Sequence, residues 1–426
     1  MKKLIERLPK DLLDPVYLMR DIVEERGYDA YLVGGFVRDL ILGVKNFDLD
    51  FVIEREGIRV AEIMSQKLKA RLIRHHRFGT ATIMQAHRHK IDISTARKEY
   101  YPHPASLPHV SPGHLKDDLF RRDFTVNALA VAVNDSSFGT LIDYYGGLKD
   151  LRDGNVRILH ENSFIDDPTR ILRGIRFEQR FDFTIEPKTK RCLNAAVRMG
   201  MLEKVQPQRL RDDLILMFKE EHPLKEIGRM RKLTGFSFID KDLSLSPENL
   251  RFFRDIERCI QWFKQEFSGR RHIDTWLIYF MGLLEPLSLR RTEAVLERFA
   301  FPRGDNKRIL GYKREAKMLR AALAGKRCRA SSIFNLLEPL SYEVVVLLLA
   351  SLKDARSHER IAVFLRHHNG TRTDISGRDL VSLGVEPGPH YRRILRGVLD
   401  ARLDGKVRNR DEELAFARGL AFKKKQ

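Results

Sequence analysis

The sequence predicts an α+β fold in which an N-terminal head with a small mixed sheet is followed only by helices. Short segments with strand character alternate with helical ones up to residue 153, and strand patterns become rare after Gly154. From there helical spacing continues to the end. The 426 residues suffice for roughly two to four domains. Candidate boundaries are the turn-rich stretches near 219–224, 268–271, 301–306 and 370–377.

The elements of the head follow from the spacing of its apolar residues. Alternation and β-forming residues predict strands at 29–34, 47–53, 80–85 and 90–94. Apolar residues at helical spacing predict helices from the start to Arg26 and at 36–42, 59–72 and 114–132. A polar turn at 86–89 is expected between the last two strands. Residues 99–113, with four prolines, are expected to form a loop.

Charge points to the class of partner. The net charge of +20 excludes an acidic solvating chain and favours a polyanionic partner, although a merely soluble basic surface gives the same count. Cys192, Cys259 and Cys328 lack metal-type spacing, which predicts a reducing, cytoplasmic location. The first residues do not resemble a signal peptide. The longest apolar run, 344–350, is too short to span a membrane and predicts a buried helix.

Two aspartates in one predicted strand are candidate metal ligands. Asp48 and Asp50 are two residues apart, so their side chains point to the same face of the strand. Carboxylates placed so repel each other unless a cation such as Mg²⁺ lies between them. Asp92, in the strand predicted at 90–94, is a candidate third carboxylate. A solvent-facing polar stripe is the alternative.

A pair of glycines just upstream is a candidate phosphate site. Gly34 and Gly35 follow a predicted strand and precede a predicted helix, where backbone N–H groups favour an anion. Arg38, about one turn into that helix, is placed to reach the same phosphates. An ordinary turn is the alternative for the glycines alone.

Neighbouring arginines occur in the helix predicted at 114–132. Adjacent helical residues point about 100° apart, so Arg121 and Arg122 are expected to do different work. One can face a ligand while the other pairs with an acid such as Asp118. Asn127 can contact a sugar or form a local bond. A salt-bridged helix surface is the alternative.

Asp167 and Arg170 form a candidate site for reading a nucleobase. Adenine and cytosine both present an amine donor beside a ring nitrogen acceptor, whereas guanine and uracil present the opposite pattern. A carboxylate only accepts and a guanidinium only donates, so the pair matches the first two bases. Arg173 is expected to reach further along the ligand, and Arg176 to support the site by pairing. The alternative is a helix cap at Asp167 with exposed arginines.

Four motifs, in order, resemble the class II tRNA nucleotidyltransferase and bacterial poly(A) polymerase family. They are Leu32 to Gly43 with Asp48 to Asp50, Arg121 to Leu129, Gly147 to Asp150, and Asp166 to Phe177. Gln208 to Leu214 resembles the last family helix more weakly, because the family has Glu where this chain has Gln208 and Asp213.

The resemblance implies a head at 1–153, a neck at 154–222, a helical body at 223–310 and a helical, RNA-binding tail at 311–426. It implies Mg²⁺-dependent, two-metal addition of nucleotides to an RNA 3′ end, with Asp48 and Asp50 as metal ligands and Asp92 assisting. The nucleotide-binding residues expected from these motifs are Gly34, Gly35, Arg38, Arg122, Asp123, Asn127, Asp167, Arg170, Arg173 and Arg176.

The variant at Asp166 to Arg170 and the loop before residue 114 resemble the A-adding branch most. That branch adds A from ATP to tRNA after a separate CC-adding enzyme. Full CCA addition, with CTP as a second substrate, and poly(A) synthesis are alternatives within the family. The loop is not shortened, which argues against a CC-only enzyme. A non-catalytic RNA-binding protein is the alternative outside the family.

Basic pairs in the helical region are candidate contacts for RNA phosphates, or simply solvated surface. They are Arg270-Arg271, Arg290-Arg291, Lys326-Arg327, Arg392-Arg393 and Lys423 to Lys425. Trp262 and Trp276 are expected in the core.

Overall fold

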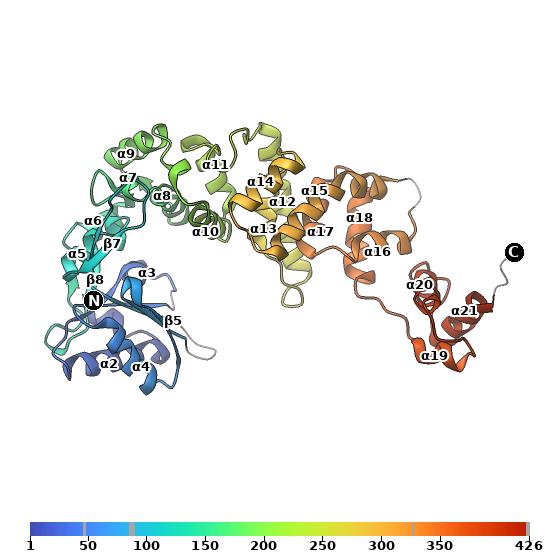
Figure 1. Cartoon of the computed structure of the whole chain (residues 1–426), viewed down its shortest axis with the longest axis horizontal. Coiled ribbons are helices and arrows are strands. Elements are labelled where there is room, and N and C mark those ends of the chain that lie inside the picture. The colour runs from blue at the N-terminus through green and yellow to red at the C-terminus, as the bar shows by residue number, and fades with distance from the viewer. Residues whose placement is uncertain (46–47, 85–89, 326–327, 423–426) are drawn as a thin grey trace. The chain divides into compact units, whose positions relative to one another are not determined.

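The computed structural model describes residues 1–45, 48–84, 90–325 and 328–422 (Figure 1). The chain forms two compact units, the first made of residues 1–214 and 220–238, the second of 215–219 and 239–426. The boundary near residue 238 lies inside the predicted body, and the division into four segments remains a prediction. Some predicted features lie outside the described residues: the turn at 86–89, Phe47, Lys326-Arg327 and the lysines at 423–425.

The first unit contains the predicted mixed sheet. It has seven strands in the order β3-β4-β5-β2-β1-β8-β9, with β2 and β5 parallel and the other neighbours antiparallel. In chain order the strands are β1 (Ala30–Val33), β2 (Leu49–Ile53), β3 (Arg71–His75), β4 (Thr80–Met84), β5 (Lys90–Thr95), β8 (Ala130–Ala132) and β9 (Leu141–Ile142). The four predicted head strands are confirmed as β1, β2, β4 and β5.

Helices before and between the strands support the sheet. They are α1 (Lys2–Ile5), α2 (Lys10–Glu24), α3 (Gly34–Leu42) and α4 (Gly57–Lys67). Helices α2 and α4 pack on each other beside the sheet, and α4 contacts β4 and β5 (Figure 1). Helix α3 ends at Gly43, whose φ of 70° is the left-handed conformation that glycine adopts without strain. The predicted end of this helix at residue 42 is confirmed.

The helix predicted at 59–72 is confirmed up to Lys67 and is wrong at 68–72. Helix α4 ends at Lys67, Lys69 has a φ of 50°, and the chain turns into β3. Strand β3 lies at the edge of the sheet, and most of its side chains are exposed. Because an exposed edge strand does not need apolar alternation, its sequence gave no strand signal.

The loop predicted at 99–113 and the helix predicted at 114–132 are also corrected. Strands β6 (Arg97–Tyr100) and β7 (His109–Pro112) form an antiparallel ribbon. Helix α5 (Leu115–Phe120) is followed by a 3₁₀ turn at Thr125–Asn127 and then by β8. Asp123 Oδ1 accepts from the amide of Phe124 at 2.9 Å, a local bond that competes with helix formation.

The remainder of the first unit is mostly helical. Its helices are α6 (Gly147–Asp153), α7 (Ser163–Asp166), α8 (Thr169–Arg180), α9 (Pro187–Arg198) and α11 (Pro223–Leu233), and α10 (Pro207–Phe218) runs from the first unit into the second. The expectation of helices alone after Gly154 needs one correction. Strands β10 (Asn155–Val156) and β11 (Thr184–Ile185) form a short parallel pair.

The second unit has no strand among its described residues. Its helices are α12 (Pro247–Glu266), α13 (Thr275–Leu283), α14 (Leu289–Arg298), α15 (Arg303–Ala324), α16 (Ala330–Leu337), α17 (Tyr342–Ser351), α18 (Ala355–Val363), α19 (Gly377–Ser382), α20 (His390–Leu403) and α21 (Arg410–Phe422), with a π-helical turn at Phe364–His368. The apolar run 344–350 is buried within α17, and Trp276 is buried, as predicted. Trp262 is only half-buried.

Among the described residues, no single helix is long and apolar enough to cross a membrane. The bent pair α16 and α17 passes the test only when the two helices are taken together.

Candidate functional site

A row of polar side chains crosses three strands on one face of the sheet. Asp50 on β2 lies directly opposite Asp92 on the parallel strand β5, and Thr82 on β4 lies opposite Asp92 from the other side. Residues paired in this way point to the same face. Asp48 directly precedes β2, two residues from Asp50. Asp50 and Asp92 are therefore neighbours, and the charge of Asp48 acts on Asp50.

Asp50 is the most buried member of this group, and its environment disfavours a negative charge. Burial raises the pKa of Asp50 from 3.8 to about 6, and the charges of Asp92 and Asp48 add to the rise while that of Arg122 opposes it. A cavity of about 340 Å³ is lined by Asp50, Asp92 and Arg122 among others. Oxygen donors with excess negative charge beside open space fit a divalent cation.

The first of the two glycines has a backbone conformation that glycine adopts without strain, and Arg122 packs against it. Gly34 has a φ of 67°, and a Cβ added there would lie 2.5 Å from Nη1 of Arg122 and 3.9 Å from the Asp50 carboxylate. Only glycine leaves this space free without strain. A Cβ on Gly35 would lie 3.6 Å from Nη2 of Arg38, so the side chain of Arg38 underlies the same turn.

Arg121 and Arg122 depart from the predicted helical arrangement. Arg121 lies at the end of α5 and Arg122 just beyond it, so the angle between adjacent helical residues does not apply. Both pair with buried Asp118: Nη2 of Arg121 lies 2.6 Å from Oδ1 and Nη2 of Arg122 lies 3.0 Å from Oδ2. Although burial opposes it, the two arginines lower the pKa of Asp118. Nε of Arg122 is buried without a hydrogen-bond partner among the described residues.

Asp123, Asn127 and Arg38 form a buried network beneath the glycines. Asn127 donates to Oδ1 of Asp123 at 2.8 Å and accepts from Nη1 of Arg38 at 2.5 Å. Arg173 donates to Oδ2 of Asp123 from Nε at 2.9 Å and from Nη2 at 2.5 Å. Although burial opposes it, the charge of Arg173 lowers the pKa of Asp123 below its ordinary value. Asp39 takes two further donors of Arg38, so that guanidinium is held rigidly.

The proposed base-reading pair is held by residues other than each other. Oδ1 of Asp167 accepts from Nη2 of Arg209 at 2.7 Å and from Oγ1 of Thr169 at 2.8 Å. Arg170 donates to Oγ of Ser163 and to the carbonyl of Arg121, both at 2.7 Å. Asp167 also accepts from the amide of Thr169 at 3.2 Å, which agrees with the alternative of a helix cap. Capping uses only one of its two oxygens.

One cavity of about 570 Å³ in the first unit brings most of the predicted residues together. From the predicted set it is lined by Gly35, Arg38, Asp50, Arg122, Asp123, Asn127, Asp167, Arg170, Arg173 and Arg176. Gly34, Asp48 and Asp92 do not line this cavity. Arg176 was expected to support the site by pairing. It lines this cavity, and its Nε lies 3.7 Å from Oε1 of Glu220.

The lining residues that were not selected from the sequence include Arg209, Glu99 and Tyr101. Arg209 pairs with Asp167 and keeps a buried Nη1 without a hydrogen-bond partner among the described residues. Glu99 accepts from Arg97 at 2.8 Å, from Arg121 at 3.1 Å and from Tyr101, whose ring also lines the cavity. Arg209 is forty-two residues from Asp167 in the chain, so local spacing gave no signal for the pair.

The motif at 147–150 stabilises the turn that carries Asn127. Asp150 is buried and accepts from Oγ1 of Thr125 at 2.7 Å. A Cβ on Gly147 would overlap the carbonyl oxygen of Thr125. Gly147→Ala is therefore expected to destabilise the protein by about 1–3 kcal/mol through overpacking. Thermal unfolding of the full chain checks this. Gly228→Ala, in a helix with open space at Cβ, is the matched control and is expected not to lower the melting temperature.

Glu226 on α11 gives a pH-dependent stability. Its side chain is buried, and burial, followed by the charge of Glu220, raises its pKa from 4.5 to about 9, against Arg176 and Arg180. Between these values the native state keeps a proton that the unfolded chain has lost, so stability falls as pH rises. Glu226→Gln is expected to become more stable than the unchanged protein, by up to ~1.4 kcal/mol per pH unit in this window. Melting temperatures across the window check this, and a constant difference would contradict it.

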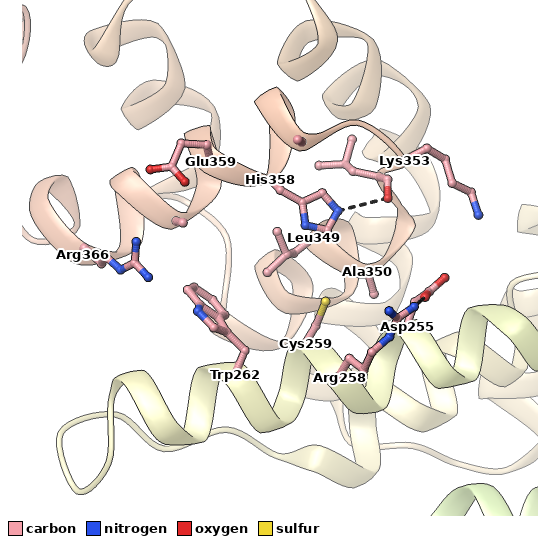
Figure 2. A pocket seen from close by; sticks show the side chains of 13 residues that line it. Asp255, Arg258, Cys259, Trp262, Leu349, Ala350, Lys353, His358, Glu359 and Arg366 are labelled. Atoms are coloured by element: carbon pink, nitrogen blue, oxygen red, sulfur yellow. Dashed lines mark hydrogen bonds and ion pairs between the residues drawn. The ribbon is translucent and has the colours of Figure 1, made fainter.

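A cavity of about 640 Å³ in the second unit has a different character. It lies among α12, α17 and α18, with Trp262, Cys259 and His358 on its walls (Figure 2). Arg258 at its edge pairs with Asp255, and His358 Nε2 lies 3.1 Å from the carbonyl of Leu352. Arg366, which also lines it, pairs with Glu266, and the cavity lining does not include a row of carboxylates like that of the first unit.

Comparison with known proteins shows a matching head-domain family and long relatives. The Poly A polymerase head domain family matches residues 30–157. An A-adding tRNA nucleotidyltransferase of Geobacter sulfurreducens is 38% identical over 414 residues, which are 95% of this chain but 47% of that protein. One of Halalkalibacterium halodurans is 30% identical over 96% of this chain and 93% of its own length. The chain thus spans about half the length of the first relative and nearly all of the second.

Solved structures extend the similarity to nearly the whole chain. A CCA-adding enzyme in an apo form has a TM-score of 0.79 and 35% identity, covering 97% of both chains. A Thermotoga maritima CCA-adding enzyme complexed with tRNA has a TM-score of 0.76 and 34% identity at the same coverage. With the shared head domain and relatives that match from end to end, this chain belongs to the tRNA nucleotidyltransferase family that carries the poly(A) polymerase head.

Proposed function

We propose that this chain adds nucleotides to the 3′ end of tRNA without a template, and that its product is the terminal A added from ATP. The observation that supports this most is the single cavity that joins Asp50 and Arg122 at one side to Asp167 and Arg170 at the other. A nucleoside triphosphate spans these two groups, with its phosphates at the carboxylates and its base at the arginines.

The phosphate end of the site is built from the glycine turn and the basic residues around it. The 3′-hydroxyl oxygen of the tRNA attacks the α-phosphorus, the bond to the β-phosphate bridging oxygen breaks, and pyrophosphate leaves. Asp48 and Asp50 would hold Mg²⁺, which supplies activation of the hydroxyl and neutralisation of the leaving group. Nε of Arg122, buried without a hydrogen-bond partner among the described residues, is available to a phosphate oxygen.

The base end of the site presents one acceptor and fixed donors. Oδ1 of Asp167 is taken by Arg209 and Thr169, and no hydrogen bond to Oδ2 is found among the described residues. Oδ2 therefore can accept from the exocyclic amine of adenine or cytosine. Guanine and uracil would set a carbonyl against this carboxylate, leaving a charged group unpaired. The guanidinium of Arg170 supplies the matching donor.

Specificity for A is supported by three relatives that are 30–38% identical over 79–96% of this chain, each named an A-adding tRNA nucleotidyltransferase. Other relatives, which match 57% and 93% of this chain, are named a CCA-adding enzyme and a CC-adding tRNA nucleotidyltransferase. A separate enzyme that supplies the two preceding C residues then acts before this one.

Basic residues of the second unit are proposed to contact tRNA phosphates. Among them are Arg372, Arg392 and Arg396, which line one shallow cavity.

Primer extension tests the proposal. Three tRNA transcripts, ending at the discriminator base, after one C and after both Cs, are each given Mg²⁺ with ATP, CTP or both. We expect one A on the CC-ended transcript alone. Completion of CCA from the discriminator base would make this a full CCA-adding enzyme, and long A tails would make it a poly(A) polymerase. Binding of tRNA with no extension would leave a non-catalytic RNA-binding protein.

A further inference from the structure

The third carboxylate of the site, Asp92, is already paired on both of its oxygens. Thr82 donates to Oδ1 from Oγ1 at 2.6 Å, and Nζ of Lys90 lies 2.5 Å from Oδ2. Lys90 precedes Asp92 by two residues on β5, so both side chains leave the same face of the strand. Thr82 reaches Asp92 from the opposite position on β4. A neutral donor and a cation thus share this carboxylate.

The ammonium of Lys90 also interacts electrostatically with all three carboxylates, Asp92, Asp48 and Asp50. Burial lowers the pKa of Lys90, but the hydrogen bond and charge of Asp92, together with the charges of Asp48 and Asp50, raise it overall. Like charges on opposed strand positions destabilise a sheet. Lys90 therefore offsets part of the repulsion between Asp92 and Asp50, which is the same electrostatic task that a bound cation performs.

We propose that Lys90 is a built-in counter-ion that competes with the divalent cation for Asp92. This inference rests on the proposed function and concerns the regulation of the same site. The lysine side chain is 45% exposed and flexible, so its ammonium can leave for solvent when a metal ion takes its place. Mg²⁺ is commonly bound by few carboxylates together with substrate phosphates. Lys90 keeps the nucleotide-free site weak for cations and makes metal binding depend on the triphosphate.

The test measures metal binding directly in the full chain without nucleotide. Free Mn²⁺ is followed by electron paramagnetic resonance during titration of the unchanged protein, Lys90→Met, Lys90→Gln and Lys90→Arg. Removal of the charge in Lys90→Met and Lys90→Gln is expected to tighten Mn²⁺ binding about five- to tenfold. Lys90→Arg keeps the charge and is expected to bind as the unchanged protein does. Lys98→Met removes a comparable lysine–aspartate pair on β6, 3.6 Å from Asp117, and is the matched control without effect on Mn²⁺.

A second background shows whether the effect passes through Asp92. Lys90→Met introduced into Asp92→Asn is expected to change Mn²⁺ affinity much less than it does in the unchanged protein, because the contested carboxylate is gone and only the longer-range charges of Asp48 and Asp50 remain. Lys90→Met is also expected to lower the melting temperature of the metal-free protein, and Mn²⁺ to restore it. Equal Mn²⁺ affinity in Lys90→Met, Lys90→Gln and the unchanged protein would overturn the inference. Mn²⁺ binding that Asp50→Asn leaves intact would instead count against the metal site of the proposed function.

Discussion

Asp50→Asn is expected to reduce nucleotide addition by about 1,000-fold or more, because the amide cannot replace a carboxylate as a metal ligand. Loss of several kcal/mol of transition-state stabilisation corresponds to a rate effect of this size. Single-turnover extension of a CC-ended tRNA with ATP measures it. tRNA binding is expected to remain, since Asp50 lies in the cavity of the first unit and contributes no positive charge.

The same substitution is expected to leave the fold at least as stable. The native pKa of Asp50 is raised to about 6 by burial, so the unfolded carboxyl ionises at lower pH than the native one. Stability therefore falls as pH rises between the two values, and an ionised Asp50 costs stability at neutral pH. Asparagine removes that cost. A melting temperature at or above that of the unchanged protein, with activity lost, separates the chemical role from misfolding. Activity within tenfold of the unchanged protein would contradict the assignment.

Asp167→Asn is expected to lower the preference for ATP over GTP by about 100-fold. The amide of asparagine can donate as well as accept, so the carbonyl of guanine no longer faces an unpaired charge. The ratio of kcat/KM values for the two nucleotides measures this effect. An unchanged ratio would assign base selection to other residues.

Arg209→Met tests whether Arg209 positions Asp167 rather than contacting the base itself. The substitution removes the ion pair at 2.7 Å that fixes Oδ1, so we expect KM for ATP to rise about tenfold or more with a smaller effect on kcat. Arg198→Met removes an exposed arginine of α9 and is the matched control, with no change expected. Equal kinetics for Arg209→Met and the control would exclude a positioning role.

The head was predictable where local pattern and burial agree. Strands β1 and β2 and the turn at Gly34 follow from apolar alternation and from glycine, and the parallel pairing of β5 with β2 then brings Asp92 beside Asp50. The whole chain also follows the predicted order of a mixed sheet before helices. Here the local sequence pattern is sufficient, because the apolar residues of each element mark the face that it buries.

Other features depend on contacts between distant segments. The turn after α5 is held by the side chains of Asp123 and Asn127, whose bonding partners lie as far away as Arg38 and Arg173. Arg209 can be recognised as a site residue only from the structure, where it pairs with Asp167. The spacing of apolar residues over 114–132 predicted a single helix. In the structure, part of this stretch is a 3₁₀ turn and a strand, whose buried apolar residues happen to recur at helical intervals.

The central claim is most directly tested by following both products of one reaction. The purified chain is given CC-ended tRNA, Mg²⁺ and ATP labelled in the α-phosphate. Incorporated AMP is counted by its label, and released pyrophosphate is measured by a coupled enzymatic assay. The account predicts one AMP per tRNA and one pyrophosphate per AMP, with both lost in Asp50→Asn. CC-ended tRNA that is bound but gains no label, with no release of pyrophosphate, would contradict it.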